Sequence, residues 1–183
     1  MKVRTIILFV VSLLLSSMPS LANKESRIYL LHSDRLYHDT QIDAQAQILV
    51  GNVQFLHDEV LMYCDSALFY EASNSLDAFG NVRMVQGDTL SLTGDVLYYD
   101  GLEKLARVRN NVVLVHGQMT LYTDSLDYDR LYNVGYFFEG GHLVTEDNEL
   151  TSDWGEYRPD TKVAVFNYNV HMVSPPAPQK VRT

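Results

Sequence analysis

The tetrapeptide Val96-Leu97-Tyr98-Tyr99 lies in the stretch that decides the fold, because similar tetrapeptides recur on both sides of it. We align it with Ala67-Leu68-Phe69-Tyr70, with Ser125-Leu126-Asp127-Tyr128 and, more loosely, with Trp154-Gly155-Glu156-Tyr157. The closing tyrosines of these four copies are separated by a constant interval of about 29 residues, which is the sequence signature of a repeat protein.

A second motif keeps the same phase as the tyrosines. It is a small or polar pair followed by an apolar residue, and its copies are Gly51-Asn52-Val53, Gly80-Asn81-Val82, Asn110-Asn111-Val112, Gly140-Gly141-His142-Leu143 and Tyr168-Asn169-Val170. A third feature, the apolar pair Leu76 and Phe79, recurs with the period of the tyrosines, up to Val163 and Phe166. Agreement of three features over several copies indicates a true repeat.

Each repeat has the patterning of β-structure. Apolar residues alternate with others around Leu97 and Tyr99 and again at Val82 and Met84, which puts one face on a core. Asp43–Gln47 fits either one turn of helix or a strand. We therefore predict an all-β chain in which each unit of the repeat holds two or three short strands. Such a unit cannot bury its own apolar face, so the units must stack into an elongated pair of rolled sheets or a solenoid.

The amino terminus predicts export. Lys2 and Arg4 precede an apolar run from Ile6 to Leu15, and Ser20-Leu21-Ala22 offers the small residues of a cleavage site. The alternative, a membrane anchor, needs roughly 20 apolar residues, which this run does not reach. We predict a signal peptide over residues 1–22, a β-domain over residues 23–173 and a Pro-rich flexible tail over residues 174–183.

The charge and the polar residues narrow the classes of function. Loss of residues 1–22 leaves 12 basic against 23 acidic residues, a net charge of about −11 that disfavours nucleic acid. Cys64 is the only cysteine, which excludes an internal disulfide and a multi-cysteine zinc site, and we expect it to be buried. Recurrent aspartates near the closing motifs, at Asp65, Asp95, Asp124 and Asp153, leave calcium binding and glycoside cleavage as alternatives to structural roles. Their recurrence favours structure, and the six histidines show no metal-ligand spacing.

The repeats resemble the OstA-like family of periplasmic lipopolysaccharide-transport proteins. The resemblance rests on Gly-Asn-Val followed by a Gly/Asp turn and a closing Leu-x-Tyr, and on an opening strand ending in Ser33-Asp34; it covers about residues 28–173. It implies a β-jellyroll of two antiparallel sheets in a V, with lipid acyl chains in the groove between them. It also implies no catalysis, no cofactor, and head-to-tail joining of domains through their end strands.

The resemblance, extended by the repeat register, implies a set of groove residues. They are Tyr29, Leu31, Val53, Phe55, Leu68, Tyr70, Val82, Met84, Leu97, Tyr99, Val112, Leu114, Leu126, Tyr128 and Tyr157. The alternative for each of them is a plain core position, since alternating apolar residues in a two-sheet fold usually form the core. Tyrosine favours a groove, because its hydroxyl suits an apolar site with a wet edge. The copy at Trp154 has lost its leucine and is a candidate cap.

The function predicted from these observations is non-catalytic binding of lipopolysaccharide in the periplasm of a Gram-negative bacterium and its transport toward the outer membrane. The expected partners are lipopolysaccharide or a related glycolipid, other OstA-like proteins, and further copies of this chain. The acidic charge favours recognition through acyl chains, or a different glycolipid. The alternatives are a structural β-repeat scaffold and a polysaccharide-binding β-solenoid.

Overall fold

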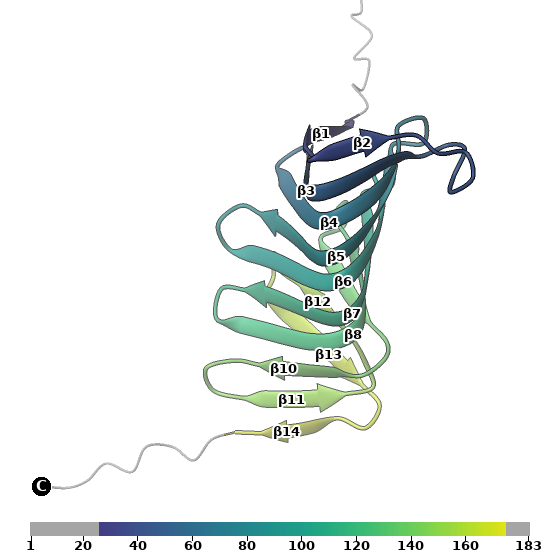
Figure 1. The fold of residues 1–183 in the computed structure, drawn as a ribbon. Coiled ribbons are helices and arrows are strands. Elements are labelled where there is room, and N and C mark those ends of the chain that lie inside the picture. Colours follow the sequence, from purple (N-terminus) through teal and green to yellow (C-terminus); the bar gives the residue numbers. More distant parts are fainter. Residues whose placement is uncertain (1–25, 175–183) are drawn as a thin grey trace, which may run out of the picture.

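The computed structural model describes residues 26–174 and shows an all-β protein (Figure 1). Its strands are β1 (Ile28–His32), β2 (Arg35–Tyr37), β3 (Gln47–His57), β4 (Val60–Tyr70), β5 (Ser75–Gln86), β6 (Leu90–Asp100), β7 (Leu105–His116), β8 (Met119–Asp129), β9 (Val134–Phe137), β10 (Gly141–Val144), β11 (Glu149–Ser152), β12 (Trp154–Arg158), β13 (Val163–Asn167) and β14 (His171–Val173). The predicted signal peptide and nearly all of the predicted tail lie outside the described residues. Within residues 26–174 no helix is long and apolar enough to cross a membrane.

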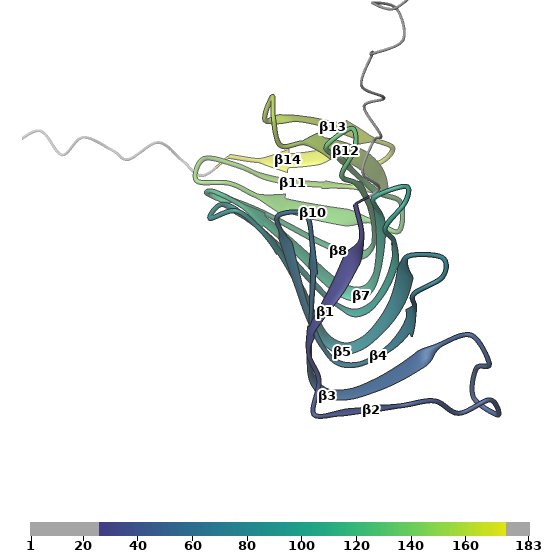
Figure 2. The same ribbon diagram turned by 90° about the horizontal axis from the view of Figure 1, so that it is seen from above.

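The strands form a single antiparallel sheet of 14 strands that divides after β8. The first half of β8 pairs with β10, and this branch continues through β11 to β14. The second half of β8 pairs with β9, and that branch continues through β12 to β13. At the other end, β1 and β2 pair with different halves of β3. The sheet is therefore folded along its length into a β1–β14 wall and a β2–β13 wall, which face one another (Figure 2).

Strands β3 to β8 are each 11 or 12 residues long, so the prediction of two or three short strands per repeat was wrong. The reason is that the Gly-Asn pairs lie inside strands. Gly80 and Asn81 stand opposite a single residue of β6, Asp95, which makes a β-bulge that bends the strand from one wall into the other. From β3 to β8 each repeat is thus two long bent strands, whereas the last part of the chain is divided among the short strands β9 to β14. Of the segment that fitted a helix or a strand, residues 43–47, the first four residues form an irregular bend and Gln47 begins β3.

The bulges stack into a corner that runs the length of the molecule. Both residues of the pair adopt positive φ, for example +75° at Gly80 and 46° at Asn81. A Cβ on Gly80 would come within 2.6 Å of the Asp65 carboxylate, so this position requires glycine on two grounds.

The recurrent aspartates are the other half of the corner. The side-chain amide donates to a carboxylate in Asn52–Asp34, Asn81–Asp65, Asn111–Asp95 and Asn169–Asp153, at 2.7–2.9 Å. The structural interpretation is thus confirmed for Asp65, Asp95 and Asp153, whereas Asp124 accepts from a backbone N–H, that of Asn111. Cys64 beside the corner is buried, as predicted, and burial raises the pKa of its thiol to about 12.

Candidate functional site

The space between the two walls is the candidate site, and most of the predicted groove residues line it. Val53, Phe55, Val82, Met84, Val112 and Leu114 face it from the β1–β14 wall, and Leu97, Tyr99, Leu126, Tyr128 and Tyr157 face it from the β2–β13 wall. All of them are buried, and Leu97, Leu114 and Leu126 have no exposed surface. The middle of the interior is therefore a packed core in this structure.

Four predicted groove residues lie elsewhere. Leu68 and Tyr70 are only half-buried, because Ala67 and Phe69 are the buried residues of β4. The alignment of Tyr70 with Tyr99 was wrong by one residue. The corner aspartates of the two copies, Asp65 and Asp95, are one residue farther apart than these tyrosines, so Phe69 and not Tyr70 corresponds to Tyr99. The Tyr70 hydroxyl donates instead to Asp43 at 3.1 Å.

The first strand shows the same error in facing. Tyr29 and Leu31 are 56% and 51% exposed and lie on the outer face of β1. Ile28 and Leu30 occupy the inner face, because they pair with the inward-facing His57 and Phe55 of β3. A one-residue slip of this kind moves every side chain to the opposite face of a strand.

A row of polar residues, the polar seam, runs along the mouth of the interior, where the hairpin ends of the two walls meet. His57, Gln86 and His116 end strands of the β1–β14 wall, and Tyr99, Tyr128 and Tyr157 stand on the other wall. Two pairs bridge the mouth: the Tyr99 hydroxyl lies 2.6 Å from His57 Nδ1, and the Tyr157 hydroxyl lies 2.8 Å from His116 Nδ1. His57, Gln86 and His116 were not predicted as site residues, although they recur with the period of the repeat.

The titration of the seam reflects its low exposure to water. Burial raises the pKa of Tyr99 and of Tyr128 to about 12 and raises that of Tyr157 as well. Burial lowers the pKa of His57. Because Arg130 can only donate, its bond to the Tyr99 hydroxyl leaves that hydroxyl to donate to a neutral His57.

The mouth is clasped at one end of the seam. Lys104 Nζ, on a loop of the β2–β13 wall, lies 2.8 Å from Asp58 Oδ2, at a hairpin tip of the β1–β14 wall. Arg130 Nη2 approaches the same oxygen at 3.9 Å. Burial opposes ionisation of Asp58, but hydrogen bonds from Lys104 and Ser26 outweigh it, and the pKa of Asp58 falls to about 2.

The mouth is open at the opposite end. A cavity of about 420 Å³ lies between β10 and β13, where Met119 and Leu143 of one wall face Tyr157 and Ala164 of the other. A second cavity, of about 290 Å³, lies under β1 and is lined by Leu30 and Phe69 among others. The packed middle of the interior is thus continued by hollows toward both ends.

A family model described as OstA-like protein matches residues 25–178. The chain belongs to the OstA-like family. Comparison with curated protein sequences gives no significant match. Among solved structures, this OstA-like chain is similar to the crystal structure of LptH from Pseudomonas aeruginosa, described as the LptA-homologous periplasmic component of the conserved lipopolysaccharide transport device. The two are 14% identical, with a TM-score of 0.59 over 64% of this chain and 95% of that one, which confirms the predicted jellyroll fold.

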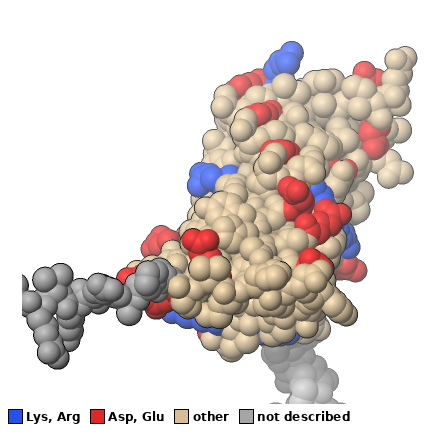
Figure 3. All heavy atoms as spheres, turned by 90° about the horizontal axis from the view of Figure 1, so that it is seen from below, with Lys and Arg blue, Asp and Glu red and all other residues tan. Residues whose placement is uncertain are grey.

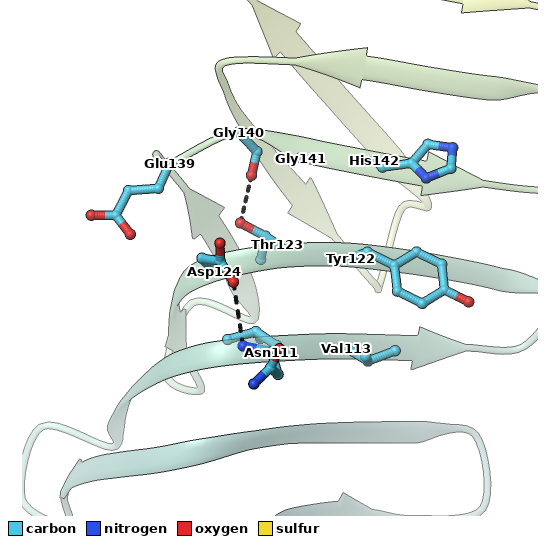
Figure 4. Close-up of a pocket in the computed structure, with 10 residues that line it drawn as sticks. Asn111, Val113, Tyr122, Thr123, Asp124, Glu139, Gly140, Gly141 and His142 are labelled. Atoms are coloured by element: carbon cyan, nitrogen blue, oxygen red, sulfur yellow. Dashed lines mark hydrogen bonds between the residues drawn. The ribbon is translucent and has the colours of Figure 1, made fainter.

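Another hollow of this OstA-like chain belongs to the corner. It has a volume of about 440 Å³ and lies where Gly141 replaces the asparagine of the repeat (Figure 4). Asp124 there accepts a hydrogen bond from the Asn111 backbone N–H at 3.3 Å, and Thr123 Oγ1 donates to the Gly140 carbonyl at 2.6 Å. A Cβ on Gly141 would collide with the Phe137 ring, so the asparagine cannot be accommodated. This hollow is explained by packing.

Groups that could bind a metal are absent from residues 26–174, since no three His, Cys, Asp or Glu side chains cluster suitably. Acidic side chains are prominent on the face drawn in Figure 3. The candidate site of this OstA-like chain is the interior with its mouth. It offers apolar surface, and the tyrosine hydroxyls and histidine imidazoles of the seam lie along its edge.

Proposed function

We propose that this OstA-like protein binds lipopolysaccharide by its acyl chains between the two walls and passes it toward the outer membrane. The observation that carries the proposal is the open mouth, where a cavity leads between the walls beside the buried Met119 and Tyr157. Apolar chains entering there would extend the packed core, while the sugar headgroup stays in water at the polar seam. LptH, whose fold is similar, is a component of a lipopolysaccharide transport device.

The proposed action is binding and transfer without catalysis, in the periplasm of a Gram-negative bacterium. Because the middle of the interior is packed, the walls must part to admit chains. Each core side chain would then pack against an acyl chain and no longer against the opposite wall. The apolar side chains stay out of water, so parting the walls costs little apolar burial.

The proposed partners are other OstA-like proteins or further copies of this chain, joined through end strands. Strand β14 is exposed along its length, and Met172 and Val173 are 58% and 65% exposed. At the other end, β2 exposes Leu36 and Tyr37. Exposed strand edges of this kind pair with a strand of another chain. Head-to-tail pairing would bring the hollow near β10 and β13 toward the hollow under β1 of the next molecule.

The test is site-specific photo-crosslinking in cells, with a photoreactive phenylalanine at Tyr157 and a matched control at Tyr122. Tyr157 lines the open cavity, and Tyr122 is 47% exposed on the outer face of β8. We expect a lipopolysaccharide adduct from Tyr157 and none from Tyr122. Failure to form an adduct from Tyr157 or from Tyr99, or equal adducts from both faces, would contradict lipid binding in the interior and favour a structural scaffold.

A further inference from the structure

The clasp at the mouth brings two cations onto one carboxylate oxygen. Lys104 Nζ and Arg130 Nη2 both face Asp58 Oδ2, at 2.8 Å and 3.9 Å. The three residues come from different loops, and the contacts cross from one wall to the other. This charge contact joins the two walls beside the hydrogen bond between His57 and Tyr99.

The charges of the clasp do not balance. Asp58 offers one negative charge to two cations, and the burial of His57 keeps its imidazole neutral. The Asp100 carboxylate also acts on Tyr99, but it accepts from the N–H groups of Leu102 and Glu103, at 2.9 Å and 3.0 Å, and forms no ion pair with either cation. The two cations of the clasp thus share one carboxylate as their ion-pair partner among the described residues.

Arg130 is the strained member of this cluster. Its side chain is only 6% exposed, its distance to Asp58 is long for an ion pair, and its buried Nε has no hydrogen-bond partner among residues 26–174. A buried cation is costly unless it is closely paired. An anion with two or more oxygens, a carboxylate or a phosphate, satisfies a guanidinium better, because such pairs are frequently bidentate.

We propose that Lys104 and Arg130 form a binding site for the anionic headgroup of an amphiphile, and that the Asp58 carboxylate occupies this site until the headgroup displaces it. The inference rests on the proposed function, since it places the headgroup at the mouth of the interior that takes the chains. The headgroup is a phosphate or carboxylate. Its binding also opens the clasp, because the displaced Asp58 no longer ties one wall to the other.

The first experiment compares ligands on the full mature chain by isothermal titration below their micelle concentrations. The probes are dodecyl phosphate, the uncharged dodecyl maltoside and inorganic phosphate. We expect dodecyl phosphate to bind about tenfold more tightly than dodecyl maltoside, and inorganic phosphate to bind more weakly than either.

The three probes separate the two proposals. Equal binding of the charged and uncharged amphiphiles would overturn the headgroup site and leave binding in the interior intact. Binding of neither amphiphile would overturn both proposals. Inorganic phosphate binding as tightly as dodecyl phosphate would identify a free-anion site and overturn the amphiphile assignment.

The second experiment uses variants with a matched control. Lys104→Gln should weaken dodecyl phosphate binding about fivefold and leave dodecyl maltoside unchanged, whereas Asp58→Asn should tighten dodecyl phosphate binding by a similar factor. The control is Arg83→Gln, because Arg83 is an exposed cation on the outer face of β5, away from the mouth. An equal loss in Arg83→Gln, or no change in Lys104→Gln, would overturn the site. Lys104 is partly exposed, so its variant should fold.

Discussion

The corner and the mouth are the two long edges of the same interior, and the repeat treats them differently. At the corner, four repeats carry the same contact between an asparagine amide and an aspartate. At the mouth, the equivalent positions carry His57, Gln86 and His116. Both histidines contact a tyrosine hydroxyl of the other wall, but His57 also contacts Arg130. The corner thus uses the same side-chain contact in four repeats, whereas the contacts at the mouth differ from one end to the other.

This difference separates what the repeat needs for folding from what it leaves free for function. A bend must be made in every repeat, so each copy needs residues that accept positive φ and a partner for the exposed turn. The mouth has no such common requirement. One end of it is clasped by Asp58, Lys104 and Arg130, and the other end opens into a cavity.

The largest effect should come from Gly80→Ala at the corner. The new Cβ would sit at positive φ and within 2.6 Å of the Asp65 carboxylate, so we expect the free energy of unfolding to fall by about 3 kcal/mol. Urea denaturation measures the loss. The control is Gly87→Ala in a hairpin, where φ is also positive but no heavy atom lies within 4 Å of the Cβ.

We expect Gly87→Ala to cost only about 1 kcal/mol. If both variants lost the same stability, backbone conformation alone would explain the glycines, and the packing of aspartate against the corner would have no measurable role.

The next effect concerns the mouth. Tyr99→Phe removes the hydroxyl that joins Arg130 to His57, so we expect a loss of about 2 kcal/mol from buried groups left without a partner. Tyr157→Phe should cost less than about 1 kcal/mol, because His116 is only half-buried and water can replace the lost hydroxyl. Equal losses by urea denaturation would show that the two ends of the mouth are alike in solution.

The same contrast explains what could be predicted from the sequence. The repeat, the all-β class and the structural aspartates were predictable, because four of the five copies of the corner carry the same contact between an asparagine and an aspartate. Strand facing failed at β4, where alignment on Tyr70 concealed one extra residue between the corner aspartates, and burial follows Phe69 instead. The tyrosine was a poor marker, because Tyr70 points to the loop at Asp43.

The clasp could not have been predicted. Asp58, Lys104 and Arg130 lie on loops of different repeats, and their separations do not follow the period. They meet only because the bend at the corner folds one half of each strand over the other. A contact that depends on this closure leaves no local signal in the sequence.

A smaller effect tests the corner contact itself. In a double-mutant cycle, Asn81→Ala and Asp65→Ala should show a coupling free energy of about 0.5–1 kcal/mol, since the hydrogen bond of 2.8 Å is exposed to water. Asp65 with Asn111, which bonds to Asp95 instead, is the control pair and should show no coupling. Coupling in the control pair would mean that the corner responds as a unit and that its individual contacts cannot be separated.

The smallest effect is the pH dependence of the clasp. Asp58 has a folded pKa of about 2, below its ordinary value of 3.8, so its pairing stabilises the protein above about pH 4. That contribution is lost as the pH falls toward 2, and solvent screening limits it to about 1 kcal/mol. Urea denaturation from pH 5 to pH 2 should therefore show a steeper fall for the wild type than for Asp58→Asn.

The other acidic residues titrate in both proteins, so the difference between the two profiles isolates Asp58. Lys104→Gln should reduce the same difference, because Lys104 provides the hydrogen bond that does most to lower the pKa of Asp58. Identical profiles for wild type and Asp58→Asn would show that the clasp is open in solution. The mouth would then be open at both ends in solution. The histidine–tyrosine pairs would be the remaining difference between the mouth and the corner.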